Sequence, residues 1–118
     1  MTGTLCAIAN AVALAVERGV KIALGTDIFL TGFWGRNAEE LGYMVAGGMT
    51  SLQAIECATA NGPETLGPQA PKAGQLLEGF DADVICVSGD PSSDVSVLAD
   101  NDNVTHVFKG GTLFKSPG

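Results

Sequence analysis

Histidine is almost absent from this sequence, which limits the metal chemistry that the chain can perform by itself. His106 is the single histidine among 118 residues. A catalytic zinc ion usually has three protein ligands, and histidine is prominent among them. His106 lies in "VTHVFKGGTLF", a segment that we predict to be a β-hairpin, so we interpret it as a strand residue. The chain alone therefore lacks most of the ligands of a metal-dependent enzyme.

Basic residues are also scarce. The chain contains six lysines and arginines and thirteen aspartates and glutamates, which gives a formal net charge of -7. Contacts with nucleic-acid phosphates need clustered basic side chains, so this composition argues against a nucleic-acid partner. The acidic residues are dispersed along the chain and form no acidic tail.

Cysteine is too sparse and too irregularly spaced for a disulfide framework. The three cysteines, Cys6, Cys57 and Cys86, are odd in number and form no CxxC pair. Each lies inside an apolar run, where free cysteine commonly packs as a small buried side chain. We interpret all three as packed thiols and the fold as independent of disulfides.

The chain has no hydrophobic run long enough to cross a membrane. Its longest apolar stretch, "LCAIANAVALAV" from Leu5 to Val16, contains Asn10 and is too short for a bilayer. No lysine or arginine precedes it, as one would in a secretory signal. We predict a buried helix over residues 5–18, no membrane partner and, since no targeting signal is visible, a cytoplasmic location.

A short apolar segment follows this helix and ends at a carboxylate. "VKIAL", from Val20 to Leu24, is bounded by glycines and predicts a buried strand of an α/β protein. Asp27 lies three residues beyond it, at the strand end where such folds place their chemistry. Asp27 could instead cap a loop through its own side chain, and the spacing alone leaves both readings open.

Two further helices and an antiparallel β region are predicted after Asp27. The pairs Asn37 with Glu40 and Thr50 with Gln53 have the capping-box spacing, and "NGP" from Asn61 to Pro63 is typical of a helix stop. "ADVICV" predicts a strand, "GDPSSDVSVL" a turn leading into a short helical piece, and Gly110-Gly111 a hairpin turn. Asp81, Asp83 and Asp90 are interpreted as turn residues.

The order of these motifs resembles that of a known family. The strand ending in "GTD" is followed by "AGGMTSLQAIECATANGPETLG" and then by "GQLLEGFDADVICVSGDP". This succession resembles the C-terminal region of the amidohydrolase superfamily, in its imidazolonepropionase-like and prolidase-like branch, which includes ochratoxin-hydrolysing amidases. The resemblance extends from about residue 5 over nearly the whole chain.

The resemblance implies an α/β fold with a metal centre. Residues 1–68 would form the end of a (β/α)8 barrel, with its last strand and closing helices, and residues 69–118 the C-terminal part of a small β-sandwich. Asp27 would be both a metal ligand and the catalytic proton acceptor. The metal would be divalent, with two zinc ions in the complete protein. The other ligands of the family, several histidines and a carboxylated lysine, have no counterpart here.

Two residues of the loop after Asp27 are further candidates for substrate binding. Trp34 could line a substrate pocket or anchor the loop, and we favour anchoring. Arg36 could receive a substrate carboxylate through two of its guanidinium nitrogens, although an exposed arginine beside a helix start is commoner.

The sequence is compatible with two functions. The first is the C-terminal segment of an amidohydrolase that cleaves C–N bonds in a small amide or dipeptide-like substrate, inactive as this chain alone. The second is a non-catalytic module that binds a partner chain. In both cases the helix before Val20 would expose apolar surface, so we expect an oligomer or dependence on a further N-terminal part.

Overall fold

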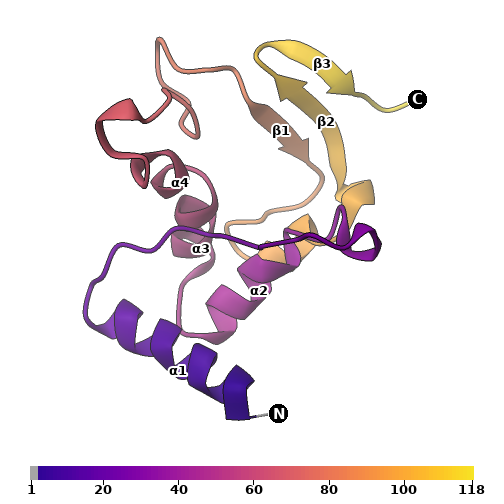
Figure 1. The fold of residues 1–118 in the computed structure, drawn as a ribbon. Helices are drawn as coiled ribbons and strands as arrows, with labels where there is room; N and C mark the ends of the chain where they lie inside the picture. The colour runs from indigo at the N-terminus through magenta and orange to yellow at the C-terminus, as the bar shows by residue number, and fades with distance from the viewer. Residues whose placement is uncertain (1–2) are drawn as a thin grey trace.

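The computed structural model describes residues 3–118, except for the side chains of residues 3–6 and 8. A helical part precedes a small sheet (Figure 1). No helix in the described range is long and apolar enough to cross a bilayer. The helices are α1 (Gly3–Glu17), α2 (Glu39–Ala46), α3 (Ser51–Ala58) and α4 (Asn61–Glu64), and the strands are β1 (Val84–Val87), β2 (Val104–Lys109) and β3 (Thr112–Lys115).

Helix α1 forms where the sequence predicts it, but it is not buried. Val12 and Val16 pack against the core, whereas Leu14 is exposed. The prediction of a buried helix is wrong for the described side chains, because α1 packs against α2 while Leu14 remains 50% exposed. That contact needs Gly47, since a Cβ there would lie 2.8 Å from a methyl group of Val12. The exposure of Leu14 confirms the prediction that this helix exposes apolar surface.

The segment from Val20 to Leu24 is not a strand. It has no strand partner among the described residues, whose one sheet contains β1, β2 and β3. A parallel strand is stable only between neighbours, and residues 3–118 supply none for this segment. Its backbone is held by α3 instead, because the Leu24 amide donates to the Cys57 carbonyl at 2.9 Å.

The helix starts and stops differ in how well they follow local sequence signals. The predicted capping box of Asn37 and Glu40 is wrong, because α2 has Ala38 as its N-cap and no side-chain hydrogen bond there. The one at Thr50 is confirmed: the Gln53 amide donates to Thr50 Oγ1 at 3.2 Å, and the Thr50 amide donates to Gln53 Oε1 at 2.8 Å. The chain does not leave helical structure at residues 61–63, where α4 adds one turn. Pro63 is tolerated there because the first turn of a helix needs no amide donor.

The core lies among α2, α3 and a 3-10 helix, η3 (Val95–Leu98), that precedes β2. Cys57 is buried as predicted, and burial raises the pKa of its thiol, as expected for an inert packing residue. Cys86 is exposed, contrary to prediction, because nothing in the described chain covers its face of β1. The side chain of Cys6 lies outside the described residues. The buried core residues are Leu41, Met44, Met49, Ala54, Cys57 and Val95.

The last third of the chain contains an antiparallel sheet, as predicted, with the strands in the order β1-β2-β3. Gly110 and Gly111 have φ angles of 55° and 79° and make the two-residue turn between β2 and β3. His106 lies in β2, opposite Cys86, which confirms its interpretation as a strand residue. Asp90 accepts hydrogen bonds from the Ser92 amide and the Ser93 hydroxyl, which confirms its role in a turn.

The hairpin turn is also tied to Asp83, and this contact predicts a pH dependence. Asp83 accepts hydrogen bonds from Lys109 Nζ at 2.7 Å and from the Gly110 amide at 2.8 Å. The Lys109 hydrogen bond, helped by that of Gly110, holds the pKa of the Asp83 carboxyl below its usual range. A lowered folded-state pKa means that the stabilisation is present above the unfolded value of about 4 and is lost as pH falls through the folded value.

We therefore expect the Gly110 amide to exchange faster with solvent as the pH falls below about 4, after correction for intrinsic exchange. In Asp83→Asn this acid-dependent step should vanish, because no carboxylate remains to be protonated. Glu78→Gln is the control, because it removes one negative charge at an exposed position five residues earlier in the chain. An unchanged acid step in Asp83→Asn would contradict the assignment.

Candidate active site

Asp27 stands in an unusual backbone conformation. Its φ angle is 47°, and it is the one non-glycine residue with positive φ in the described chain. Aspartate tolerates this left-handed region better than most residues because its short side chain can hydrogen-bond locally. Strained conformations gather at functional sites. The side chain is exposed, and among the side chains that the structure describes it has no ion-pair or hydrogen-bond partner.

The segment that leads to Asp27 is held by a buried side-chain amide, that of Asn61, for which no sequence pattern predicted a functional role. Asn61 is 7% exposed, and its Nδ2 donates to the Ile22 carbonyl at 2.8 Å. Together with the hydrogen bond from the Leu24 amide to the Cys57 carbonyl, this bond holds residues 20–24 against α3 and α4, shortly before Asp27. The available signal was an asparagine directly after an apolar helix, which we interpreted only as a helix stop.

Replacing Asn61 should destabilise the fold. Asn61→Ala leaves the Ile22 carbonyl without its protein donor, which should lower the free energy of unfolding by about 1–3 kcal/mol. The measurement is urea denaturation followed by circular dichroism. Asn101→Ala is the matched control, because Asn101 Nδ2 also donates to a distant carbonyl, that of Gly35 at 3.1 Å, but is exposed. Equal losses in both variants would contradict a special role for Asn61.

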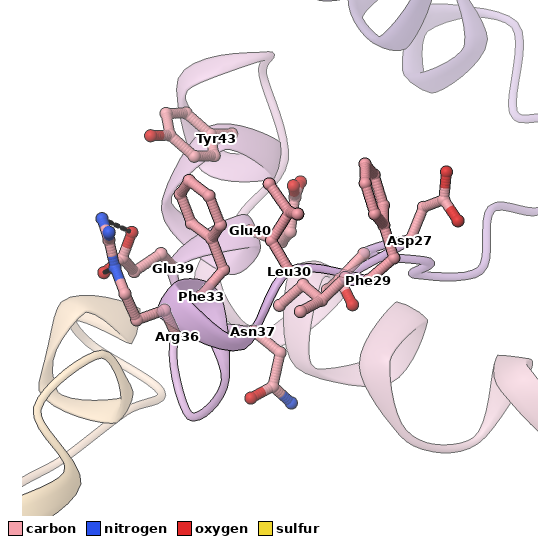
Figure 2. A pocket seen from close by; sticks show the side chains of 11 residues that line it. Asp27, Phe29, Leu30, Phe33, Arg36, Asn37, Glu39, Glu40 and Tyr43 are labelled. Carbon is pink, nitrogen blue, oxygen red and sulfur yellow. Dashed lines mark hydrogen bonds and ion pairs between the residues drawn. The ribbon is translucent and has the colours of Figure 1, made fainter.

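A cavity of about 310 Å³ lies beside Asp27. Figure 2 shows its side chains, with Asp27 at one end and Arg36 at the other. The structure thus brings two of the predicted site residues to one cavity. Trp34 is not part of the lining and is 67% exposed. The cavity is lined by Thr26, Asp27, Ile28, Phe29, Leu30, Phe33, Arg36, Asn37, Glu39, Glu40 and Tyr43.

Arg36 is already engaged by a neighbouring carboxylate. Its Nε donates to Glu39 Oε1 at 2.8 Å and its terminal nitrogen to Glu39 Oε2 at 2.9 Å. The pair raises the pKa of Arg36 and lowers the pKa of Glu39, in each case mainly through the hydrogen bonds. The guanidinium also lies 5.3 Å from the centre of the Phe33 ring. A substrate carboxylate would have to displace Glu39 to bind Arg36.

The described residues do not fit a complete metal centre. No group of three or more histidine, cysteine, aspartate or glutamate side chains within them is arranged to hold an ion. His106 lies in β2, with its Nδ1 3.0 Å from Thr105 Oγ1 and its ring stacked on Phe108. Asp27 could contribute one oxygen ligand, but by itself it cannot hold a divalent ion in the usual geometry.

Comparisons with known proteins agree on one family. The model of the amidohydrolase family matches residues 5–114. An ochratoxinase of Aspergillus niger is 53% identical over 105 residues, which is 88% of this chain and 21% of that protein. The crystal structure of A. niger ochratoxinase superimposes with a TM-score of 0.84 at 51% identity, over 93% of this chain and 25% of the other.

A second solved structure is more distant. The crystal structure of a Xaa-Pro dipeptidase with methionine in its active site has a TM-score of 0.78 at 38% identity, over 92% of this chain and 26% of that one. The chain therefore spans about a fifth to a quarter of the length of the relatives that it matches.

Proposed function

The chain belongs to the amidohydrolase family, and we propose that it acts as part of a metal-dependent hydrolase that cleaves C–N bonds of small amide or dipeptide-like molecules. The observation that carries the proposal is the 53% identity to an ochratoxinase over 88% of the chain. The matching segment is a fifth of that relative, so the proposed activity needs residues beyond those described here. The (β/α)8 barrel and β-sandwich implied by the family resemblance belong to the same proposal.

In this proposal Asp27 accepts the proton of the attacking water and delivers it to the leaving amine. An exposed carboxylate on the wall of a cavity, with no partner of its own in the described chain, is free to make that contact. A divalent metal, zinc by family resemblance and two ions in the complete enzyme, would be bound by Asp27 together with ligands from outside residues 3–118. Such an ion lowers the pKa of bound water.

Complementation tests the proposal. The chain is mixed or co-expressed with the portion of A. niger ochratoxinase that it does not cover, and the complex is assayed for zinc content and for hydrolysis of ochratoxin and small N-acyl amides. We expect zinc and hydrolysis in the complex and neither in the isolated chain. A stable complex that binds no zinc and hydrolyses nothing would contradict the proposal.

A second candidate, a non-catalytic module that binds a partner chain, is favoured by the exposed apolar side chains of α1 and the segment after it. Leu14 and Val20 are both exposed there. Under this alternative the chain would form a complex, but the charge of Asp27 would have no effect on any activity of that complex.

A further inference from the structure

The segment that leads to Asp27 is held by few contacts. Between Lys21 and Asp27 its backbone has two hydrogen bonds to described residues, one at Ile22 and one at Leu24. The sheet of the described chain does not include it. The side chain of Lys21 pairs with Glu64, but both are exposed, and surface ion pairs contribute little to stability. The position of Asp27 therefore depends on the bonds at Ile22 and Leu24.

These two bonds match the spacing of their partners. Ile22 and Leu24 are two residues apart, which is up to about 6.6 Å when the chain is extended. Cys57 and Asn61 are four residues apart, which is about 6 Å or one turn along a helix. The Cys57 carbonyl lies in the last turn of α3, where carbonyls lack a partner within the helix, and it accepts from the Leu24 amide. The Ile22 carbonyl needs a donor, and the side chain of Asn61 supplies it at 2.8 Å.

Side-chain packing around Ile22 is incomplete. Two cavities, of about 300 and 180 Å³, adjoin this residue, and Asn61 lines both. Asn61 itself is buried, so its bond to the Ile22 carbonyl is largely shielded from competing water. A hydrogen bond is directional, whereas apolar contacts are not, so this bond fixes the register of the segment more strictly than the apolar contacts around it.

We propose that Asn61 is a positioning residue that sets the backbone of Asp27 through the Ile22 carbonyl. Asp27 has a φ of 47°, and a non-glycine residue persists in this region only where the surrounding structure holds it. The backbone from Gly25 to Asp27 has no hydrogen bond of its own to described residues, so the constraint comes from the bonds just before it. Without the Asn61 bond, Asp27 relaxes to negative φ and its carboxylate leaves the cavity wall. The effect on hydrolysis rests on the proposed function, whereas the effect on the Asp27 backbone does not.

The first test measures the backbone of Asp27 by NMR in the 118-residue chain. A positive φ brings the amide and α hydrogens of one residue close together and gives a strong NOE between them. Asn61→Leu removes the donor but keeps a side chain of similar size, so the Asp27 NOE should fall to the intensity seen at Ile28, whose φ is negative. Asn61→Asp, which has the shape of asparagine and no amide donor, is read in the same way if Asn61→Leu does not fold. An unchanged Asp27 NOE would overturn the proposal.

Val95→Ala is the control for a general loss of stability. Val95 is buried in the core, and its truncation leaves a cavity there without removing either bond of the segment. Urea denaturation compares the stability of the two variants, and the Asp27 NOE should persist in Val95→Ala. A loss of the NOE as complete in Val95→Ala as in Asn61→Leu would make Asn61 a stabilising residue only and overturn its positioning role.

The second test measures kcat and KM of the complex with the complementing portion of the ochratoxinase. Asn61→Leu should lower kcat about tenfold or more and change KM by less than about twofold, because a displaced group slows the chemical step. Asp27→Asn combined with Asn61→Leu should be no slower than Asp27→Asn alone, since Asn61 acts through Asp27. Additive losses in the double variant would overturn the proposal.

The proposed hydrolase and the positioning role of Asn61 fail in different ways. A lost Asp27 NOE in Asn61→Leu, with no hydrolysis by any complemented complex, would retain the positioning role and reject the hydrolase. Hydrolysis that depends on Asp27, with the NOE and kcat unchanged in Asn61→Leu, would retain the hydrolase and reject the positioning role.

Discussion

An Asp27→Asn variant should assemble with the complementing portion of the ochratoxinase as the original chain does, yet hydrolyse amides at least about 100-fold more slowly. A positioned proton acceptor contributes a factor of roughly 10² to 10⁴ to such reactions. Asparagine has nearly the same shape as aspartate and tolerates positive φ as well, so the φ of 47° at this position should be retained. The substitution therefore removes the charge and the proton-accepting oxygen and leaves the backbone in place.

The measurement is kcat/KM of the complemented enzyme, with complex formation checked by size-exclusion chromatography. Glu78→Gln is the matched control, because it neutralises an exposed carboxylate that does not line this cavity. We expect Glu78→Gln to stay within a few-fold of the original activity. Full activity in Asp27→Asn, or an equal loss in both variants, would remove Asp27 from the proposed mechanism.

Local sequence signals predicted the structure well where both partners of an interaction lie close together in the chain. Thr50 and Gln53 cap α3 reciprocally, and Gly110 with Gly111 makes the hairpin turn, because each feature is decided by a few adjacent residues. Even so, the same spacing failed at Asn37, where α2 begins two residues later and Arg36 pairs with Glu39. A spacing rule states which hydrogen bond is possible and not which competing contact forms.

Features that depend on distant residues could not be predicted in this way. The burial of α1 and the pairing of the segment after it depend on what packs against them, and the described chain offers only part of that surface. The role of Asn61 was missed because its acceptor, the carbonyl of Ile22, lies 39 residues away. The aromatic lining of the cavity was likewise missed, since Tyr43 joins the loop residues only once α2 packs beside them. Asp27 was proposed from its place after an apolar run and from the family resemblance, and its catalytic role stays a prediction.

The largest loss of stability should follow from Gly74→Ala. Gly74 has a φ of 79°, and a Cβ added there would lie 2.3 Å from the carbonyl oxygen of Thr59. Alanine would have to adopt a left-handed conformation, at about 1–2 kcal/mol, and also push away a backbone atom that cannot rotate aside. We expect a total loss of roughly 3 kcal/mol or more in the free energy of unfolding, which is a large part of the stability of a small domain.

Gly79 is a control that separates the cost of the left-handed conformation from the cost of the steric contact. Gly79 has nearly the same φ, 81°, but nothing within 4 Å of the position of an added Cβ. Gly79→Ala should therefore show the conformational cost alone, about 1 kcal/mol. Urea denaturation gives the loss in the free energy of unfolding for each variant, and the difference between the two losses is the cost of the contact with Thr59. Similar losses in both variants would contradict the close packing at Gly74.

The position of Gly74 connects this loss with the candidate site. Thr59 ends α3, and Asn61, which holds the segment leading to Asp27, follows two residues later. Displacing Thr59 should therefore weaken the bond between Asn61 and Ile22, so Gly74→Ala should raise amide exchange at Leu24, whose acceptor Cys57 is also in α3. Gly79→Ala should leave that exchange unchanged. The loop after α4, which contains Gly74, therefore stabilises the segment that leads to Asp27, although this loop lies far from Asp27 in the sequence.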